Sequence, residues 1–271
     1  MKNHSSFKNF IIRSITDYKI LLRNIPSTIL LFFVLSIVCA NLMANKELFN
    51  YEYIALDCGF VFSWIMFLCM DVICKRWGPK ASVKISIFAL FINLGVCFCF
   101  FLLSLTNGSW GESYNFGKNS NIVNSALNRT FGGSSFVVFG SALAFLISSI
   151  VNAFFNFLVG KKIKNHIKEN TFFHFALRSY ISTFIAQFVD NFIFAVVISR
   201  TFFGWTWKQI IFCSILGATC ELICEICFSG IGFKIVQNWE KENIGGEYID
   251  YRKNYKETKV VKNESIDNRN K

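Results

Sequence analysis

Residues 172–198 read FFHFALRSYISTFIAQFVDNFIFAVVI, and this apolar stretch decides the fold class. It exceeds the ~20 residues that an α-helix needs to cross the hydrocarbon core of a bilayer. It also contains an acid, Asp190, roughly 18 Å beyond Arg178 along a helix that rises 1.5 Å per residue. An acid at the centre of a membrane helix costs roughly 2.5 to 3.5 kcal/mol, so it normally faces a cavity, a partner or a substrate. The stretch therefore predicts a membrane helix with a polar site near its midplane.

Five further apolar segments accompany this one. The six predicted spans are Ile25–Ala44, Tyr53–Cys74, Val83–Leu105, Phe131–Gly160, Phe172–Ile198 and Gln209–Phe233. Hydrophobic residues make up 53% of the 271-residue chain and charged residues only 17%, which is too apolar for a soluble domain. We therefore predict an all-α polytopic membrane protein with six transmembrane helices. Its expected parts are a basic segment over 1–24, a membrane domain over 25–235 and a charged, disordered tail over 236–271.

Lys and Arg are distributed unequally between the loops. The loops on one predicted side contain only Lys46, Lys118, Arg129, Arg200 and Lys208. The other basic residues lie in the N-terminal segment, in the loops after the second and fourth spans and in the tail. By the positive-inside rule both termini are cytoplasmic, in agreement with an even number of spans. Most of the net charge of +11 is then expected to face anionic membrane lipids, and no separate basic domain suggests nucleic-acid binding.

Polar residues within the fifth predicted span gather on one face. At 100° per residue, a sector of about 100° contains Thr183, Gln187, Asp190, Asn191 and Phe194. Such a polar stripe must face protein or water. Arg178 lies outside the sector at the predicted cytoplasmic end, where its side chain can snorkel to lipid headgroups.

Three further acids lie in the predicted spans. Glu221 and Glu225 are one turn apart on one face of the sixth span. Asp71 lies near the inner end of the second span, where it can pair with Lys75 at i+4 or with Arg178, or contact a ligand. Because carboxylates placed close together in a low dielectric repel each other, at least one of Asp190, Glu221 and Glu225 is expected to stay protonated.

The cysteines of the sixth span suggest a metal site only by their spacing. Cys220, Cys224 and Cys227 have the spacing of a radical iron-sulfur cluster loop, but here they lie along one face of a predicted membrane helix. We interpret them as packing residues and expect no metal and no cofactor. An intramembrane enzyme using Glu221, Glu225 and these thiols is a remote alternative, because no nucleophile-base pair or histidine ligand accompanies them.

The polar stripe belongs to a series of segments that resembles a known family. The segments are residues 39–46 (CANLMANK), 67–78 (FLCMDVICKRWG), 141–152 (SALAFLISSIVN), 178–190 (RSYISTFIAQFVD) and 228–234 (FSGIGFK). In this order they are similar to segments of the bacterial queuosine precursor transporter family, also described as vitamin uptake transporters. The chain departs from the family at Lys75, Asn152 and Gly230, where many relatives have Glu, Asp and Pro.

The resemblance implies import of a 7-deazaguanine base across the bacterial cytoplasmic membrane, without enzymatic activity. The base is a queuosine precursor such as 7-cyano-7-deazaguanine, 7-aminomethyl-7-deazaguanine or queuine. Its guanine-like edge offers two adjacent donors to one carboxylate, amides serve its carbonyl and ring nitrogens, and its flat ring calls for aromatic faces. Phe62 and Trp64 are candidates for such faces. The expected substrate-binding residues are Asp190, Gln187, Asn191, Glu221, Glu225, Asp71, Asn41, Asn45, Phe67 and Phe194, with Arg178, Lys46 and Lys75 in structural or gating roles.

Other partners and substrates remain open at this stage. The chain contains no P-loop, so it is not expected to power transport with ATP by itself. A separate energising module or a homo-oligomer is compatible with the resemblance. The closest alternative function is a substrate-binding membrane subunit for another vitamin or purine.

Overall fold

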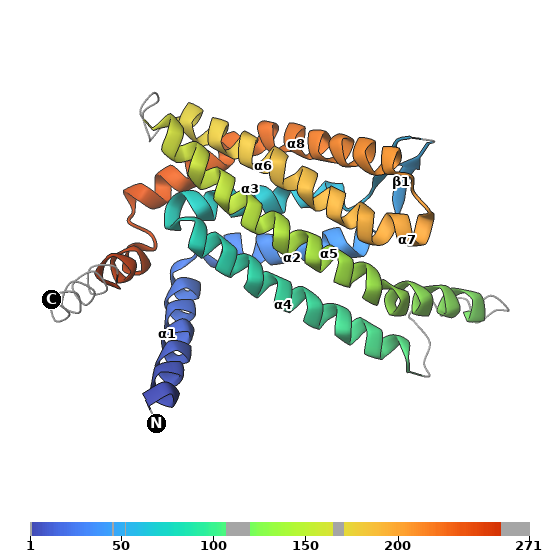
Figure 1. Ribbon diagram of the computed structural model, residues 1–271, viewed down its shortest axis with the longest axis horizontal. Coiled ribbons are helices and arrows are strands. Elements are labelled where there is room, and N and C mark those ends of the chain that lie inside the picture. Colours follow the sequence, from blue (N-terminus) through green and yellow to red (C-terminus); the bar gives the residue numbers. More distant parts are fainter. Residues whose placement is uncertain (1, 45, 52, 107–119, 165–170, 256–271) are drawn as a thin grey trace.

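The computed structural model describes residues 2–44, 46–51, 53–106, 120–164 and 171–255 (Figure 1). Its elements, in chain order, are α1 (Lys2–Asn24), α2 (Ser27–Met43), β1 (Glu47–Asn50), β2 (Ala55–Asp57), α3 (Phe60–Trp77), α4 (Pro79–Ser104), α5 (Ser120–Ile163), α6 (Phe172–Phe194), the π-helical turn η1 (Ala195–Ser199), α7 (Arg200–Phe203) and α8 (Trp207–Lys241). A turn after α8 leads into another helix over residues 246–255. The described chain is therefore almost entirely helical, as predicted.

The long helices run side by side with alternating direction, whereas α1 projects away from the bundle (Figure 1). The C-terminal ends of α3, α5 and α8 lie at one end of the bundle, together with the N-terminal ends of α4 and α6. We call this the basic end, because Lys75, Arg76, Lys80 and Lys161 lie there. The β1–β2 hairpin and α7 lie at the opposite end, called the hairpin end. This arrangement is that of a polytopic membrane protein.

Helix length and composition give four or five candidate spans among the described residues. Four helical segments are long and apolar enough to cross a bilayer: α4, the part of α5 over Val137–Ile163, α6 with η1, and α8. The bent pair of α1 and α2, which meet at 105°, is a fifth candidate. Helix α3 is not among these candidates, because its 18 residues include the charged Asp71, Lys75 and Arg76. The helical content and these candidate spans support an all-α polytopic membrane fold, and six spans remain a prediction.

The second predicted span begins later than expected. Instead of a helix from Tyr53, the chain forms the antiparallel β1–β2 hairpin, in which Phe49 pairs with Leu56. Helix α3 starts at Phe60, after this hairpin is complete. The backbone groups of Ala55 to Asp57 thus bond across the hairpin instead of along a helix, and Ala55 and Leu56 are buried against the bundle.

The described part of the predicted tail, residues 236–255, forms the end of α8, a turn and a further helix. Helix α8 continues to Lys241, and the turn that follows docks on the basic end of α3. Arg76 donates from Nε and Nη2 to the carbonyl oxygen of Ile244, at 3.0 and 2.7 Å. The indole N–H of Trp77 donates to the carbonyl oxygen of Gly245, 3.3 Å away. These contacts order the chain as far as the helix over residues 246–255.

Close packing brings the polar faces of the central helices together. Helix α6 packs against α5 and α8, and α3 packs against α2, α4, α5 and α8. A side chain at Gly232 on α8 would place its Cβ within 3.2 Å of Leu68 and Val72 of α3, so the missing side chain lets the two helices approach. The consequence is that polar residues of α3, α5, α6 and α8 meet inside the bundle.

Candidate substrate-binding site

A cavity with a volume of about 290 Å³ lies between α2, α3, α5, α6, η1, α8 and the hairpin. It is nearer the hairpin end than the basic end, because Leu56 and Trp205 belong to its lining. The volume is close to the lower limit of ~300 Å³ typical of small-molecule sites. Most of the lining is apolar, with a few polar side chains among it, as in sites that orient a small ligand.

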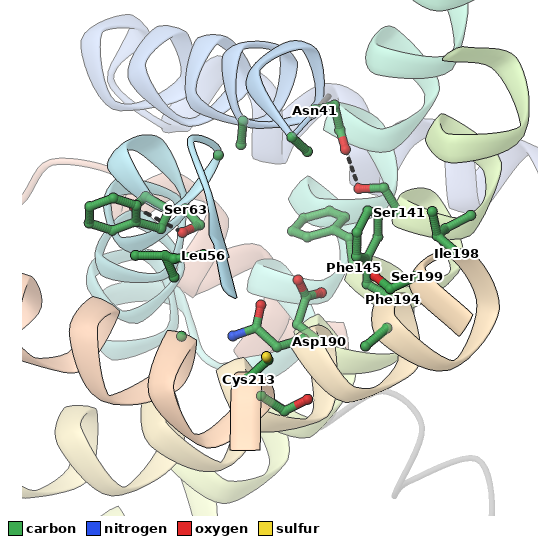
Figure 2. A pocket seen from close by; sticks show the side chains of 18 of the residues that line it. Asn41, Leu56, Ser63, Ser141, Phe145, Asp190, Phe194, Ile198, Ser199 and Cys213 are labelled. Atoms are coloured by element: carbon green, nitrogen blue, oxygen red, sulfur yellow. Dashed lines mark hydrogen bonds between the residues drawn. The ribbon is translucent and has the colours of Figure 1, made fainter. Parts of the chain in front are cut away.

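Asp190 supplies a carboxylate to this cavity from α6. Figure 2 shows its side chain beside Phe145, with the hydrogen-bonded pair of Asn41 and Ser141 across the open space. The buried hydroxyl of Ser148 on α5 donates to Asp190 Oδ1 at 2.7 Å and so fixes the carboxylate. The sequence placed this acid in a cavity or at a partner, and the structure places it at a cavity.

The next residue along α6, Asn191, supplies an amide. Its Nδ2 atom is buried, and it has no hydrogen-bond partner among the described residues. Gly217 of α8 makes room for this side chain, because a Cβ at Gly217 would lie 2.7 Å from Asn191 Nδ2. Glu221, one turn further along α8, also lines the cavity and is only 4% exposed.

Aromatic rings and a π-helical turn complete the cavity. Phe60 of α3, Phe145 of α5 and Phe194 of α6 belong to the lining. Directly after Phe194 the helix changes to the π-helical turn η1, which contributes Ala195, Ile198 and Ser199 to the wall. Single π-turns are rare and frequently occur at functional sites.

A second group of polar side chains lies deeper in the bundle, toward the basic end. We call it the buried network, and its members are Asp71 of α3, Asn152 and Asn156 of α5, Arg178, Ser179, Ser182 and Thr183 of α6, and Glu225 of α8. Asp71 is fully buried at its centre. The sequence left it to pair with Lys75 or Arg178 or to contact a ligand, and in the structure it accepts hydrogen bonds from side chains of α5 and α6.

Asp71 accepts hydrogen bonds on both carboxylate oxygens. Oδ1 accepts from Asn152 Nδ2 at 2.8 Å and from Asn156 Nδ2 at 3.0 Å. Oδ2 accepts from the hydroxyl of Thr183 at 3.1 Å and from that of Ser179. Four donors match the acceptor sites of an ionised carboxylate, which therefore has the environment of a charged group.

Arg178 points into the protein, toward α5. Its Nε donates to Asn156 Oδ1 at 2.8 Å, its Nη2 donates to the same oxygen, and Nη2 lies 3.9 Å from Cys74 Sγ. The guanidinium passes over Gly160, where a Cβ would lie 3.4 Å away. The predicted snorkelling to lipid headgroups is therefore wrong for this side chain, because α5 offers it an acceptor and a gap.

Gln187 lies between the two regions on α6, one turn from Thr183 and less than one turn from Asp190. Its side chain is fully buried. Neither its amide oxygen nor its amide nitrogen has a hydrogen-bond partner among the described residues. Buried amides are normally paired, so this position suits a water or a ligand group.

The structure divides the predicted site residues between these regions. The cavity brings together Asn41, Asp190, Asn191, Phe194 and Glu221. The buried network holds Asp71, Arg178 and Glu225, with Gln187 between the two regions. Outside both lie Phe67 in the hydrophobic core, Lys46 on the surface after α2 and Lys75 near the end of α3. Asn45 lies outside the described residues. Two other aromatic residues were proposed as stacking faces. The ring of Trp64 stacks on that of Phe228, with their centroids 4.5 Å apart, and Phe62 is not part of the cavity lining.

Several site residues were not predicted as ligands from the sequence. On α5 they are Phe145, Ser148 and Asn156, and on α6 Ser179. A usable signal exists on α5: Ser141, Ser148, Asn152 and Asn156 are separated by seven, four and four residues, a helical spacing for one polar face. Phe145 lies on the same face.

The cysteines of α8 do not form a cluster with other ligands. Cys220 and Cys224 are half-buried and Cys227 is exposed. In the part of the chain that the structure describes, no group of three His, Cys, Asp or Glu side chains is arranged to hold a metal ion. The exposed Cys227 is not packed at a helix contact, contrary to the interpretation made from the sequence.

The fold is that of an α-helical membrane protein whose bundle encloses a cavity lined by polar and aromatic side chains. The chain belongs to the family described as "Putative vitamin uptake transporter", whose model matches residues 57–238. That match runs from the end of the hairpin to the last turns of α8 and includes the cavity residues of α3, α5, α6 and α8. No curated protein and no solved structure matches the chain. Membership of this family supports the prediction of a membrane transporter over that of an intramembrane enzyme.

Proposed function

We propose that this protein imports a 7-deazaguanine precursor of queuosine across the bacterial cytoplasmic membrane. The observation that carries the proposal is the combination of Asp190 and Asn191 on one wall of the cavity. Asp190 offers carboxylate acceptors, held by Ser148. Asn191 offers an amide N–H that is buried and lacks a partner among the described residues.

The hydrogen-bonding edge of a guanine-like base matches this pair. Its ring N–H and its exocyclic amino group lie side by side, so one carboxylate accepts from both. Its adjacent carbonyl oxygen needs a donor, which the Asn191 amide supplies. Because leaving a buried donor or acceptor unpaired costs roughly 1 to 3 kcal/mol, the match favours this base over a heterocycle with a different edge.

The remaining lining suits the flat ring and its substituent. Phe145 and Phe194 offer faces for a bicyclic ring, a contact worth about 0.5 to 1.5 kcal/mol beyond its area burial for aromatic pairs. Glu221, on the α8 wall, provides a second acid. An aminomethyl group on the base is cationic at neutral pH and gains from such an acid, whereas a cyano group does not.

Complementation of a bacterial host tests the proposal. The host makes no queuosine precursor and lacks its own importer, and it is given each of the three bases in turn. We expect queuosine to appear in its tRNA only when this protein is present. If the protein inserts into the membrane at the normal level and restores queuosine with none of the bases, the substrate assignment is wrong.

A second candidate is a binding subunit for another vitamin or purine, served by a separate energising partner. The family description supports this candidate, because it names vitamin uptake and no particular substrate. A binding panel on purified protein separates the two candidates. It compares the three deazaguanines with guanine and with common vitamins, and tighter binding of a vitamin than of every deazaguanine would select the second candidate.

A further inference from the structure

The buried network contains a contact that two ionised carboxylates cannot make. The hydroxyl of Ser179 lies within hydrogen-bonding distance of both Asp71 Oδ2 and Glu225 Oε1, the latter at 2.5 Å. The two carboxyl groups also interact directly with each other. A serine hydroxyl has one hydrogen, so it can donate to only one of the two acids. The other acid must itself carry a proton and donate it.

The hydrogen-bond partners indicate which acid carries this proton. Asp71 already accepts from four groups and so has the surroundings of an ionised carboxylate. Glu225 is fully buried, and its Oε2 atom has no hydrogen-bond partner among the described residues. An ionised oxygen left without donors in the interior is very costly. Glu225 is therefore the protonated acid, and it donates to Ser179.

The charges of the network agree with this assignment. Among the described residues, the charged group that acts on Glu225 is Asp71 on α3; Arg178 on α6 and Cys74 on α3 lie near Asp71, and Glu221 lies one turn away on α8 itself. Arg178 balances one negative charge, that of Asp71. A second negative charge on Glu225 would be buried without compensation.

We propose that Glu225 is a proton-binding site that couples substrate transport to the proton gradient. The inference rests on the proposed transport function and adds its energy source. With the proton bound, Glu225 joins α8 to α3 and α6 through Ser179. When the proton leaves, two carboxylates face each other beside one cation, and their repulsion separates α8 from α3.

This separation reaches the cavity because α8 forms one of its walls. Glu221 and Gly217 lie one and two turns from Glu225 on the same helix and line the cavity. On the α6 side, the buried amide of Gln187 lies between the cavity and the network and offers a relay position for water. One proton is taken up from the cavity side and released at the basic end in each cycle, with no other chemical change.

The first test needs no substrate. Infrared spectra of the purified protein in lipid at neutral pH are recorded for wild type, Glu225→Gln and the surface control Glu242→Gln. We expect the carbonyl band of a protonated carboxylic acid in wild type and in Glu242→Gln, and its loss in Glu225→Gln. If Glu225→Gln leaves this band unchanged, Glu225 is ionised and the inference fails, whether or not the substrate assignment is right.

The second test measures coupling in proteoliposomes with the membrane potential clamped at zero. With a more acidic exterior, wild type and Glu242→Gln should concentrate the base inside by about tenfold for each unit of pH difference, if one proton accompanies each base. Glu225→Gln retains a donor for Ser179, so it should exchange labelled for unlabelled base but concentrate none.

The outcomes separate the two proposals. If wild type exchanges no base of the three, the transport proposal fails and the infrared result alone decides the charge state of Glu225. If wild type exchanges base but accumulates none in response to the pH difference, coupling by Glu225 is refuted while transport stands. Accumulation by Glu225→Gln equal to that of wild type refutes it as well. The wild-type measurement decides even if the variant fails to fold.

Discussion

The two polar regions joined by α6 differ in how their hydrogen bonds are completed. In the buried network, side chains of four helices bond to one another and Asp71 alone accepts from four donors, so that only Asn152 Oδ1 and Glu225 Oε2 of the network's buried polar atoms lack a partner among the described residues. Around the cavity, polar groups surround open space, and the Asn191 amide has no protein partner in the described chain. Polar groups that hydrogen-bond to one another are expected to have structural and charge-balancing roles. Polar groups that lack protein partners and surround a cavity are expected to bind a ligand.

The same contrast separates the acids that the sequence treated as one set. Asp190 and Glu221 line the cavity, whereas Asp71 and Glu225 face each other one to two helical turns deeper. Substitutions in the first pair should change substrate affinity, and substitutions in the second pair should change energy coupling. Four experiments can break or sharpen this division.

The largest expected effect concerns the direction in which the two regions face. Single cysteines replace Lys80 at the basic end or Lys208 at the hairpin end, both exposed, in a background without the ten native cysteines. By the positive-inside rule, an impermeant thiol reagent should label Lys208→Cys in intact cells and leave Lys80→Cys unlabelled until the cells are opened.

Equal labelling of both positions in intact cells would contradict the proposed orientation. Permeabilised cells, in which both positions should react, serve as the control for accessibility. If only Lys80→Cys is labelled, the cavity lies nearer the cytoplasm, and the proposed direction of proton movement must be reversed.

The second effect is the loss of the acceptor in the cavity. Asp190→Asn places an amide where the two donors of the base are expected, so affinity should fall by roughly 30- to 800-fold, or about 2 to 4 kcal/mol. Equilibrium binding of the base to purified wild type and variant measures this loss of affinity. Asp250→Asn, an exposed acid in the C-terminal helix, is the matched control and should bind like wild type.

The third effect is steric and acts on the cavity wall alone. Gly217→Ala would bring its Cβ to 2.7 Å from Asn191 Nδ2, so the amide must move away from its present position. Overpacking of this kind costs about 1 to 3 kcal/mol, which corresponds to a loss of affinity of roughly 5- to 150-fold if it falls on the bound state.

A control for this variant exists on the same helix. Gly230→Ala adds a methyl group where no atom lies within 4 Å, so it should leave binding unchanged. A Gly217→Ala protein that binds as tightly as wild type would show that the Asn191 amide does not contact the ligand.

The fold was predictable wherever a segment is long and uniformly apolar. Membrane helices follow from such segments because the bilayer requires internal backbone hydrogen bonding. The hairpin was missed because residues 53–56 are apolar like the span they precede, and their pairing with β1 cannot be read from that pattern. The ordered tail depends on Arg76 and Trp77, which contact Ile244 and Gly245 far along the chain.

The candidate site was predictable on each helix but not between helices. The stripe on α6 places Thr183, Asp190 and Asn191 on one face, and the structure puts all three inside the bundle. The neighbouring helices divide that stripe, because α5 presents Ser148 to Asp190 and α3 presents Asp71 to Thr183. Periodicity on one helix carries no information about which neighbour faces each turn.

The smallest expected effect comes from a matched pair of serines, one in each region. Ser148 donates to Asp190 in the cavity, and Ser179 links Asp71 to Glu225 in the network. Ser148→Ala removes a single hydrogen bond worth about 0.5 to 1.5 kcal/mol, so substrate affinity should fall by roughly two- to tenfold. Ser179→Ala should leave affinity within twofold of wild type and reduce proton-driven accumulation instead. Binding and accumulation measured on both variants decide whether the regions are separate. If Ser179→Ala weakens binding as much as Ser148→Ala does, the network belongs to the substrate site, because a serine that only links two acids away from the cavity has no direct effect on the ligand.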